Sequence, residues 1–169
     1  ASPWYVGESF ARDEVVTATL SYRLGSEGFG WMEDAVPNRG VLDWIAGLAW
    51  LQRNIAAFGG DPNRVTIAGQ SAGGAAVMRL LTLPAAQGLF ARAMAISPAD
   101  ASASVDDART AAGRIAGALG VAPTAAALGR VDELAIFHAR GAAEDPDGDD
   151  PVAGLLQRAA APLPLAPVV

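Results

Sequence analysis

Apolar and polar positions alternate along this chain in a pattern that predicts strands and helices in turn. Residues 14–22 (EVVTATLSY) are rich in β-branched side chains and apolar at most positions, which is typical of a strand covered on both faces. Across residues 39–57, apolar side chains recur every three or four positions, which indicates an amphipathic helix. Residues 64–68 and 92–97 predict two further strands, and the alanine-rich stretch 71–83 predicts a helix between them.

The order strand, helix, strand, helix, strand predicts the α/β class with a parallel doubly wound sheet. Beyond Pro98 the pattern changes, because residues 106–119 and 131–140 predict amphipathic helices with no strand between them. We therefore expect one domain in two parts, a core segment over residues 1–100 and a helical excursion with an extended tail over 101–169. Within the second part the sequence predicts three segments, namely an acidic loop at 144–150, a short helix at 152–161 and an apolar tail at 162–169.

Composition excludes several classes of chemistry. The chain contains no cysteine and no lysine, so thiol nucleophiles, disulfides, Schiff-base lysines and phosphate loops of the G-x-x-x-x-G-K-[ST] type are impossible. The single histidine, His138, cannot build a multi-histidine metal centre. A net charge of −6 without a basic cluster argues against nucleic acid and anionic membranes as partners. We therefore expect no metal centre.

One acidic region resembles a calcium-binding loop but lacks essential parts. Asp145, Asp147 and Asp149 alternate as in a calcium loop, yet the glycine is misplaced and Leu156 stands where the closing glutamate is needed.

The apolar runs of the sequence end well short of the ~20 residues that a membrane span needs. Residues 1–4 show neither a basic region nor a hydrophobic stretch, so the sequence predicts no signal peptide. A cytoplasmic and a secreted location both stay open.

The most informative motif lies in residues 65–77 (VTIAGQSAGGAAV), where a strand pattern leads through G-x-S-x-G into a helix pattern. This arrangement predicts a nucleophile elbow formed by Gly69, Gln70, Ser71 and Gly73, with Ser71 as the nucleophile. Glycine at both flanks would give the turn room. The free N–H of Ala72, at the start of the helix, is the expected oxyanion donor. The alternative is an ordinary turn in which the serine caps the helix.

Three segments in this order resemble the type B carboxylesterases, the cholinesterase-like branch of the α/β-hydrolases. They are YRLG, NRGVLDWIAGLAWLQRNIAAFGGDPNRVTIAGQSAGG and LPAAQGLFARAMAIS, and the similarity covers about residues 14–98. The resemblance implies part of a sheet of α/β-hydrolase type and hydrolysis of small-molecule carboxylic esters through an acyl-enzyme on Ser71, without a cofactor. One position departs from the family, because Gln70 replaces the usual glutamate and removes a carboxylate that could pair with an arginine such as Arg23.

The general base is the missing element of this interpretation. In the family that the chain resembles, the acid and the histidine come late in the sequence, whereas His138 falls within a predicted helix. The family's glycine-rich oxyanion loop would precede Tyr5. We therefore expect a central piece of an esterase that needs flanking segments or self-association. Two alternatives stay open, namely a non-catalytic binding module on a hydrolase scaffold and a reduced, self-sufficient esterase with His138 as the base.

Overall fold

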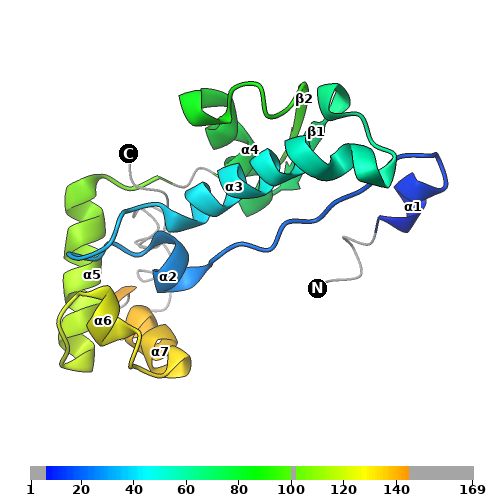
Figure 1. Cartoon of the computed structure of the whole chain (residues 1–169). Helices are drawn as coiled ribbons and strands as arrows, with labels where there is room; N and C mark the ends of the chain where they lie inside the picture. Colours follow the sequence, from blue (N-terminus) through cyan, green and yellow to red (C-terminus); the bar gives the residue numbers. More distant parts are fainter. Residues whose placement is uncertain (1–6, 100–101, 145–169) are drawn as a thin grey trace. The chain divides into compact units, whose positions relative to one another are not determined.

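The computed structural model describes residues 7–99 and 102–144, which form two compact units (Figure 1). The described parts of Ala1–Tyr22 and Val41–Asp100 make up the first unit, and those of Arg23–Gly40 and Ala101–Val169 make up the second. Most of the predicted acidic loop, the short helix at 152–161 and the apolar tail lie outside the described residues. The division of a single domain at residue 100 stays a prediction.

The first unit is built around two parallel strands and the helix that connects them. Strand β1 (Thr66–Gln70) pairs with β2 (Arg92–Ile96), with Thr66 opposite Arg92 and Gln70 opposite Ile96. Helix α4 (Ala72–Thr82) packs against both strands (Figure 1) through its buried residues Val77 and Leu80. The predicted strand, helix and strand between residues 64 and 97 are therefore confirmed, with bounds shifted by one or two residues.

Helix α3 (Arg39–Asn54) precedes β1 in the sequence and contacts the segments that lead into both strands. It continues as the 3₁₀ turn η2 (Ile55–Phe58), and its apolar face buries Trp44, Leu48 and Leu51. The side-chain amide of Gln52 donates to the carbonyl oxygens of Pro62 at 2.8 Å and Leu89 at 3.0 Å. These carbonyls belong to the segments that precede β1 and β2, so the Gln52 side chain hydrogen-bonds to both of these segments. The remaining elements of this unit are α1 (Glu8–Ala11), η3 (Pro62–Arg64) and η4 (Pro84–Ala86).

The strand predicted over residues 14–22 is wrong. The segment has no regular secondary structure, and its side chains Val15, Val16 and Leu20 are exposed. The segment does not pair with β1 or β2. It lies beside α3, where the Tyr22 ring meets that of Trp44 edge to face at 5.4 Å between centroids. A β-branched stretch becomes a strand only where a neighbouring strand offers its backbone, and the described residues offer none to this segment.

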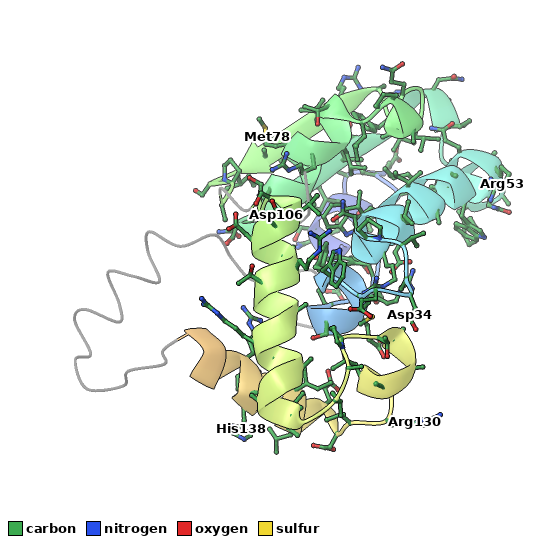
Figure 2. The ribbon with its side chains drawn as sticks, turned by 90° about the vertical axis from the view of Figure 1, so that its left-hand side faces the viewer. Asp34, Arg53, Met78, Asp106, Arg130 and His138 are labelled. Atoms are coloured by element: carbon green, nitrogen blue, oxygen red, sulfur yellow. The ribbon has the colours of Figure 1, made fainter. Side chains whose placement is uncertain are left out.

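The second unit is helical, as the sequence predicts. It contains α2 (Gly25–Phe29), α5 (Val105–Leu119), α6 (Ala125–Leu128) and α7 (Glu133–Glu144), of which α2 and α6 were not expected. The loop after α2 contacts the later part of this unit at several points, among them the hydrogen bond from the Glu33 N–H to the Pro123 carbonyl at 3.0 Å. Asp34, which is labelled in Figure 2, accepts a hydrogen bond from the N–H of Ala125 at 2.6 Å, and the guanidinium of Arg109 lies 5.2 Å from the ring centroid of Trp31.

Arg39 organises the polypeptide around α2. Its buried guanidinium donates to four carbonyl oxygens, those of Glu27 at 2.6 Å, Val36 at 2.6 Å, Ser26 at 2.8 Å and Gly30 at 2.9 Å. Burial, followed by the nearby charge of Arg23, lowers the pKa of Arg39 below its usual value, while the carboxylates of Glu27 and Asp34 act in the opposite direction. A buried cation is tolerated here because its donors are satisfied.

Candidate active site

Ser71 stands at the carboxyl end of β1 and directly before α4, in an unusual backbone conformation. Its φ of 55° and ψ of −116° lie in a region that residues with a Cβ rarely adopt. The residue is exposed, as are its neighbours Gln70 and Ala72. The sequence-predicted turn is therefore present, and it presents a serine to solvent at the edge where parallel sheets bind their ligands.

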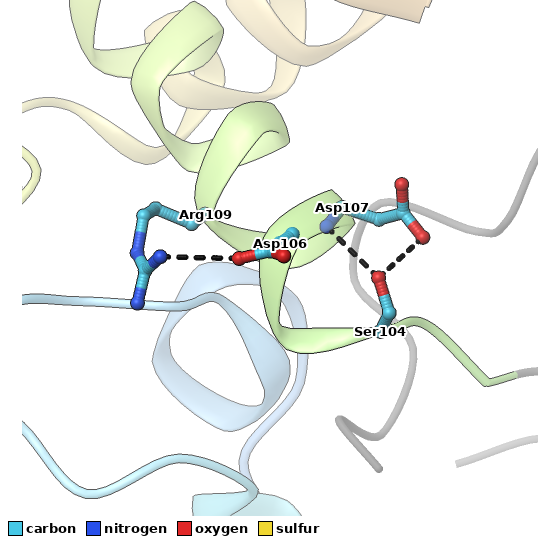
Figure 3. Close-up of polar contacts among 4 residues, drawn as sticks. All are labelled: Ser104, Asp106, Asp107 and Arg109. Carbon is cyan, nitrogen blue, oxygen red and sulfur yellow. Dashed lines mark hydrogen bonds and ion pairs between the residues drawn. The ribbon is translucent and has the colours of Figure 1, made fainter.

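A second serine in the same chain shows what an ordinary helix cap looks like. Ser104 precedes α5 with φ −67° and ψ 161°, and its hydroxyl accepts from the N–H of Asp107 at 3.1 Å and donates to the Asp107 carboxylate at 2.6 Å (Figure 3). Ser71 has neither the extended backbone of a cap nor a capping hydrogen bond. The structure thus contradicts the alternative that Ser71 merely caps its helix.

The glycines around Ser71 have different roles from those that the motif suggests. A Cβ at Gly69 would collide with the carbonyl of Gly73, so the glycine before the serine is required by close backbone approach. A Cβ at Gly73 itself would meet no atom within 4 Å, which corrects our expectation of crowding there. Gly74, which the motif does not include, is buried, and a Cβ there would lie 3.0 Å from the Ile96 oxygen and the Pro98 Cα. The doubled glycine after Ala72 was the sequence signal for this contact.

Main-chain hydrogen bonds hold Ser71 in its strained conformation. Its N–H donates to the carbonyl of Ile96 at 3.0 Å, and its carbonyl accepts from the N–H groups of Ala75 at 2.9 Å and Ala99 at 3.2 Å. A residue in such a region costs about 1–3 kcal/mol. Each hydrogen bond contributes about 0.5–1.5 kcal/mol net. The bonds together therefore match the strain, so the turn persists only while its neighbours stay in place.

Ala72 and Gln70 flank the serine and stand where the elbow motif expects them. Ala72 is the first residue of α4, so its N–H has no partner within the helix and lies at the positive end of the helix dipole. Gln70 is the last residue of β1, and as a neutral amide it adds no charge beside Ser71. The arrangement suits stabilisation of negative charge that develops next to the serine oxygen.

The structure places His138 in α7 of the second unit. Its side chain is exposed, and its ring meets that of Phe137 edge to face at 6.0 Å. The first unit, which carries Ser71, contains no histidine. Ser71 and His138 therefore belong to different units, and the identity of the base stays open.

The described residues offer neither a cluster of metal ligands nor a membrane-spanning helix. No group of three or more His, Cys, Asp and Glu side chains gathers in residues 7–99 and 102–144. Over the same ranges, every helix is too short or too polar to cross a membrane.

Comparison with known proteins identifies the family. A model described as the carboxylesterase family matches residues 1–150. The chain is 40% identical over 126 residues to the para-nitrobenzyl esterase of Bacillus subtilis (strain 168), a match that covers 72% of this chain and 26% of that protein. It is 51% identical over 82 residues to the cocaine esterase of Homo sapiens, covering 47% of this chain and 15% of that protein.

Solved structures agree with this result. A thermophilic PNB esterase superposes with a TM-score of 0.81 at 34% identity, covering 99% of this chain and 34% of that chain. A carboxylesterase of Geobacillus stearothermophilus gives a TM-score of 0.77 at 34% identity, over 100% of this chain and 35% of that chain. This segment therefore spans only about a third of the solved relatives and shows part of an α/β-hydrolase fold. The chain therefore belongs to the carboxylesterase family, the family of the type B carboxylesterases.

Proposed function

We propose that the protein containing this segment hydrolyses carboxylic esters through an acyl-enzyme on Ser71. The observation that carries the proposal is the state of Ser71, which is exposed, strained and free of any capping bond at a strand-to-helix turn. Strained residues that the surroundings hold in place cluster at functional sites. A serine that only connects two elements would gain nothing from this conformation.

In this proposal, the Ser71 oxygen attacks the ester carbonyl carbon and gives its proton to a base. The carbonyl electrons move to oxygen, and the N–H of Ala72 stabilises the resulting oxyanion. When the tetrahedral intermediate collapses, the bond to the alcohol oxygen breaks, the base returns its proton to the alcohol, and the acyl group stays on Ser71. Water then attacks the acyl-enzyme in the same way and releases the acid. Because the first unit contains no histidine, a histidine base comes from outside it.

The relatives support ester substrates. Their names describe a para-nitrobenzyl esterase and a cocaine esterase, both of which are esterases of small molecules. Together with the elbow, these names favour small-molecule carboxylic esters as the substrate class here.

The test compares two serine variants of the natural full-length protein. Ser71→Ala is expected to lower kcat for a short-chain nitrophenyl ester by about 10⁴-fold, because no other group replaces the nucleophile. Ser104→Ala is the matched control. Ser104 caps α5 in the other unit, so we expect this substitution to leave kcat unchanged. Turnover by Ser71→Ala close to that of the unaltered protein would contradict the proposal.

A further inference from the structure

The turn after β2 contacts Ser71 on both sides of its backbone. We call residues 96–99 the elbow clamp. Ile96, at one end of the clamp, accepts a hydrogen bond from the Ser71 N–H at 3.0 Å. Ala99, at the other end, donates its N–H to the Ser71 carbonyl at 3.2 Å. The clamp therefore uses both polar groups of the Ser71 main chain, and within the described part of the chain only the Ala75 N–H on the Ser71 carbonyl comes from elsewhere.

The clamp is itself a constrained turn. Ser97 has a φ of 43°, which is left-handed and unusual for a residue with a Cβ. The following residue, Pro98, has a fixed φ and no N–H, and its ring also restricts the conformations of Ser97. The first N–H available after Ser97 is thus that of Ala99, which is the group that reaches Ser71.

The clamp also packs directly on the first turn of α4. A Cβ placed on Gly74 would approach the Ile96 oxygen and the Pro98 Cα to 3.0 Å, which is closer than ordinary contact. The turn and the first turn of the helix therefore pack more closely at residue 74 than a Cβ ordinarily allows. A Cβ there is accommodated by a shift of a few tenths of an ångström in the clamp or in the start of α4.

We propose that the elbow clamp positions the Ser71 nucleophile, with Pro98 as the positioning residue that makes the clamp rigid. This inference rests on the nucleophilic role proposed for Ser71. Pro98 touches no reacting atom in this account. It acts because the direction of the Ser71 hydroxyl follows the backbone angles of Ser71, and the clamp holds those angles.

The experiment uses the natural full-length protein with Pro98→Ala, Pro98→Gly and Gly74→Ala. Pro98 is exposed, so its replacement removes rigidity without emptying a core position. We expect kcat for a short-chain nitrophenyl ester to fall about tenfold in Pro98→Ala and further in Pro98→Gly, because misplacing a catalytic group by a fraction of an ångström has effects of this order. KM is expected to stay within about twofold, since substrate binding does not depend on the clamp. The second-order rate of Ser71 labelling by a fluorophosphonate should fall in parallel with kcat.

Gly74→Ala is the steric counterpart, and Gly113→Ala is its control. Gly113 lies within α5, where an added Cβ meets no atom within 4 Å, so the same substitution gains helix propensity without a contact. We expect a loss of labelling rate in Gly74→Ala and none in Gly113→Ala. The labelling rates are measured at a temperature well below the thermal unfolding midpoint of each variant. Under this condition, lower stability alone does not change the labelling of folded protein.

The possible outcomes distinguish a failure of the clamp proposal from a failure of the nucleophile assignment. Labelling of the Pro98 variants and Gly74→Ala at the unaltered rate, with labelling of the unaltered protein at Ser71, would overturn the clamp and leave the proposed function standing. An unaltered protein that is not labelled at Ser71 would overturn both. If Gly74→Ala does not fold, the graded loss across the two Pro98 variants decides the question.

Discussion

The N–H of Ser71 donates to the carbonyl oxygen of Ile96 at 3.0 Å, one residue beyond the end of β1. Ile96 is the last residue of β2 and lies opposite Gln70 in the parallel register. The hydrogen-bonding pattern of the sheet therefore continues into the turn and attaches the serine to the neighbouring strand. A nucleophile held in this way keeps its direction without help from its own side chain.

The strain at Ser71 predicts an unusual order of stability. Glycine adopts positive φ without the cost that a Cβ brings, so Ser71→Gly relieves about 1–3 kcal/mol of strain. It also loses about 0.5–1 kcal/mol through the greater freedom of the unfolded chain. We expect Ser71→Gly to exceed Ser71→Ala in free energy of unfolding by about 1 kcal/mol in urea titrations, because alanine keeps the Cβ. A glycine variant that is less stable than the alanine variant would show that the turn is not strained.

The hydrogen bonds of Arg39 lead us to expect a large loss of stability when this residue is replaced. Arg39→Leu leaves the four carbonyl oxygens around α2 without their donor, so we expect the free energy of unfolding to fall by about 3 kcal/mol. Arg53→Leu, on the exposed side of the same helix α3, is the matched control and should change it by less than about 0.5 kcal/mol. Equal losses in the two variants, measured by urea unfolding, would refute the role given to Arg39.

The sequence predicted those elements whose patterns are local. The apolar runs of β1 and β2, the alanine-rich α4 between them and the periodic α3 each carry their own signal, and all four are present. Residues 14–22 carry a strand pattern as well, but a strand also needs a partner, and pairing is not encoded within the segment itself. The short helices α2 and α6 escaped prediction because tertiary contacts, such as Asp34 with the Ala125 N–H, support them.

Within the candidate site, the motif identified Ser71 but not what holds it. G-x-S-x-G identifies residues that are adjacent in sequence. The elbow clamp comes from the end of β2 and the turn after it, more than twenty residues later, and its hydrogen bonds come from main-chain N–H and C=O groups, which all residues except proline carry. Only the doubled glycine at Gly73 and Gly74 hinted at a close approach, and it did not show to what.

His138 leads to a prediction about the base. Its exposed position on α7, in a unit that does not contain Ser71, makes us expect that His138→Gln changes kcat of the full-length protein only slightly. The measurement is steady-state hydrolysis of a nitrophenyl ester across the pH range 5–9. A loss approaching the ~10⁴-fold expected for Ser71→Ala would instead support a self-sufficient esterase with His138 as its base.

The exposed sheet predicts the behaviour of residues 1–169 in isolation. Within the described ranges the sheet has only two strands, and the apolar side chains of Met94 and Ile96 on β2 are 49% and 43% exposed. Unpaired edges and exposed apolar strands favour association. We propose that the isolated segment elutes larger than a monomer in size-exclusion chromatography and hydrolyses a nitrophenyl ester barely above background. A monodisperse monomer with robust turnover that depends on Ser71 would contradict this.

The most direct test of the nucleophile assignment is covalent labelling of the natural full-length protein with a fluorophosphonate, followed by intact-mass measurement and peptide mapping. An activated serine forms a phosphonyl ester and loses fluoride, so we expect a single adduct per chain, located on Ser71, and loss of esterase turnover in proportion to labelling. Ser71→Ala should acquire no adduct, whereas Ser104→Ala should label like the unaltered protein. An unlabelled Ser71 in a protein that still hydrolyses esters, or an adduct on another residue, would contradict the account.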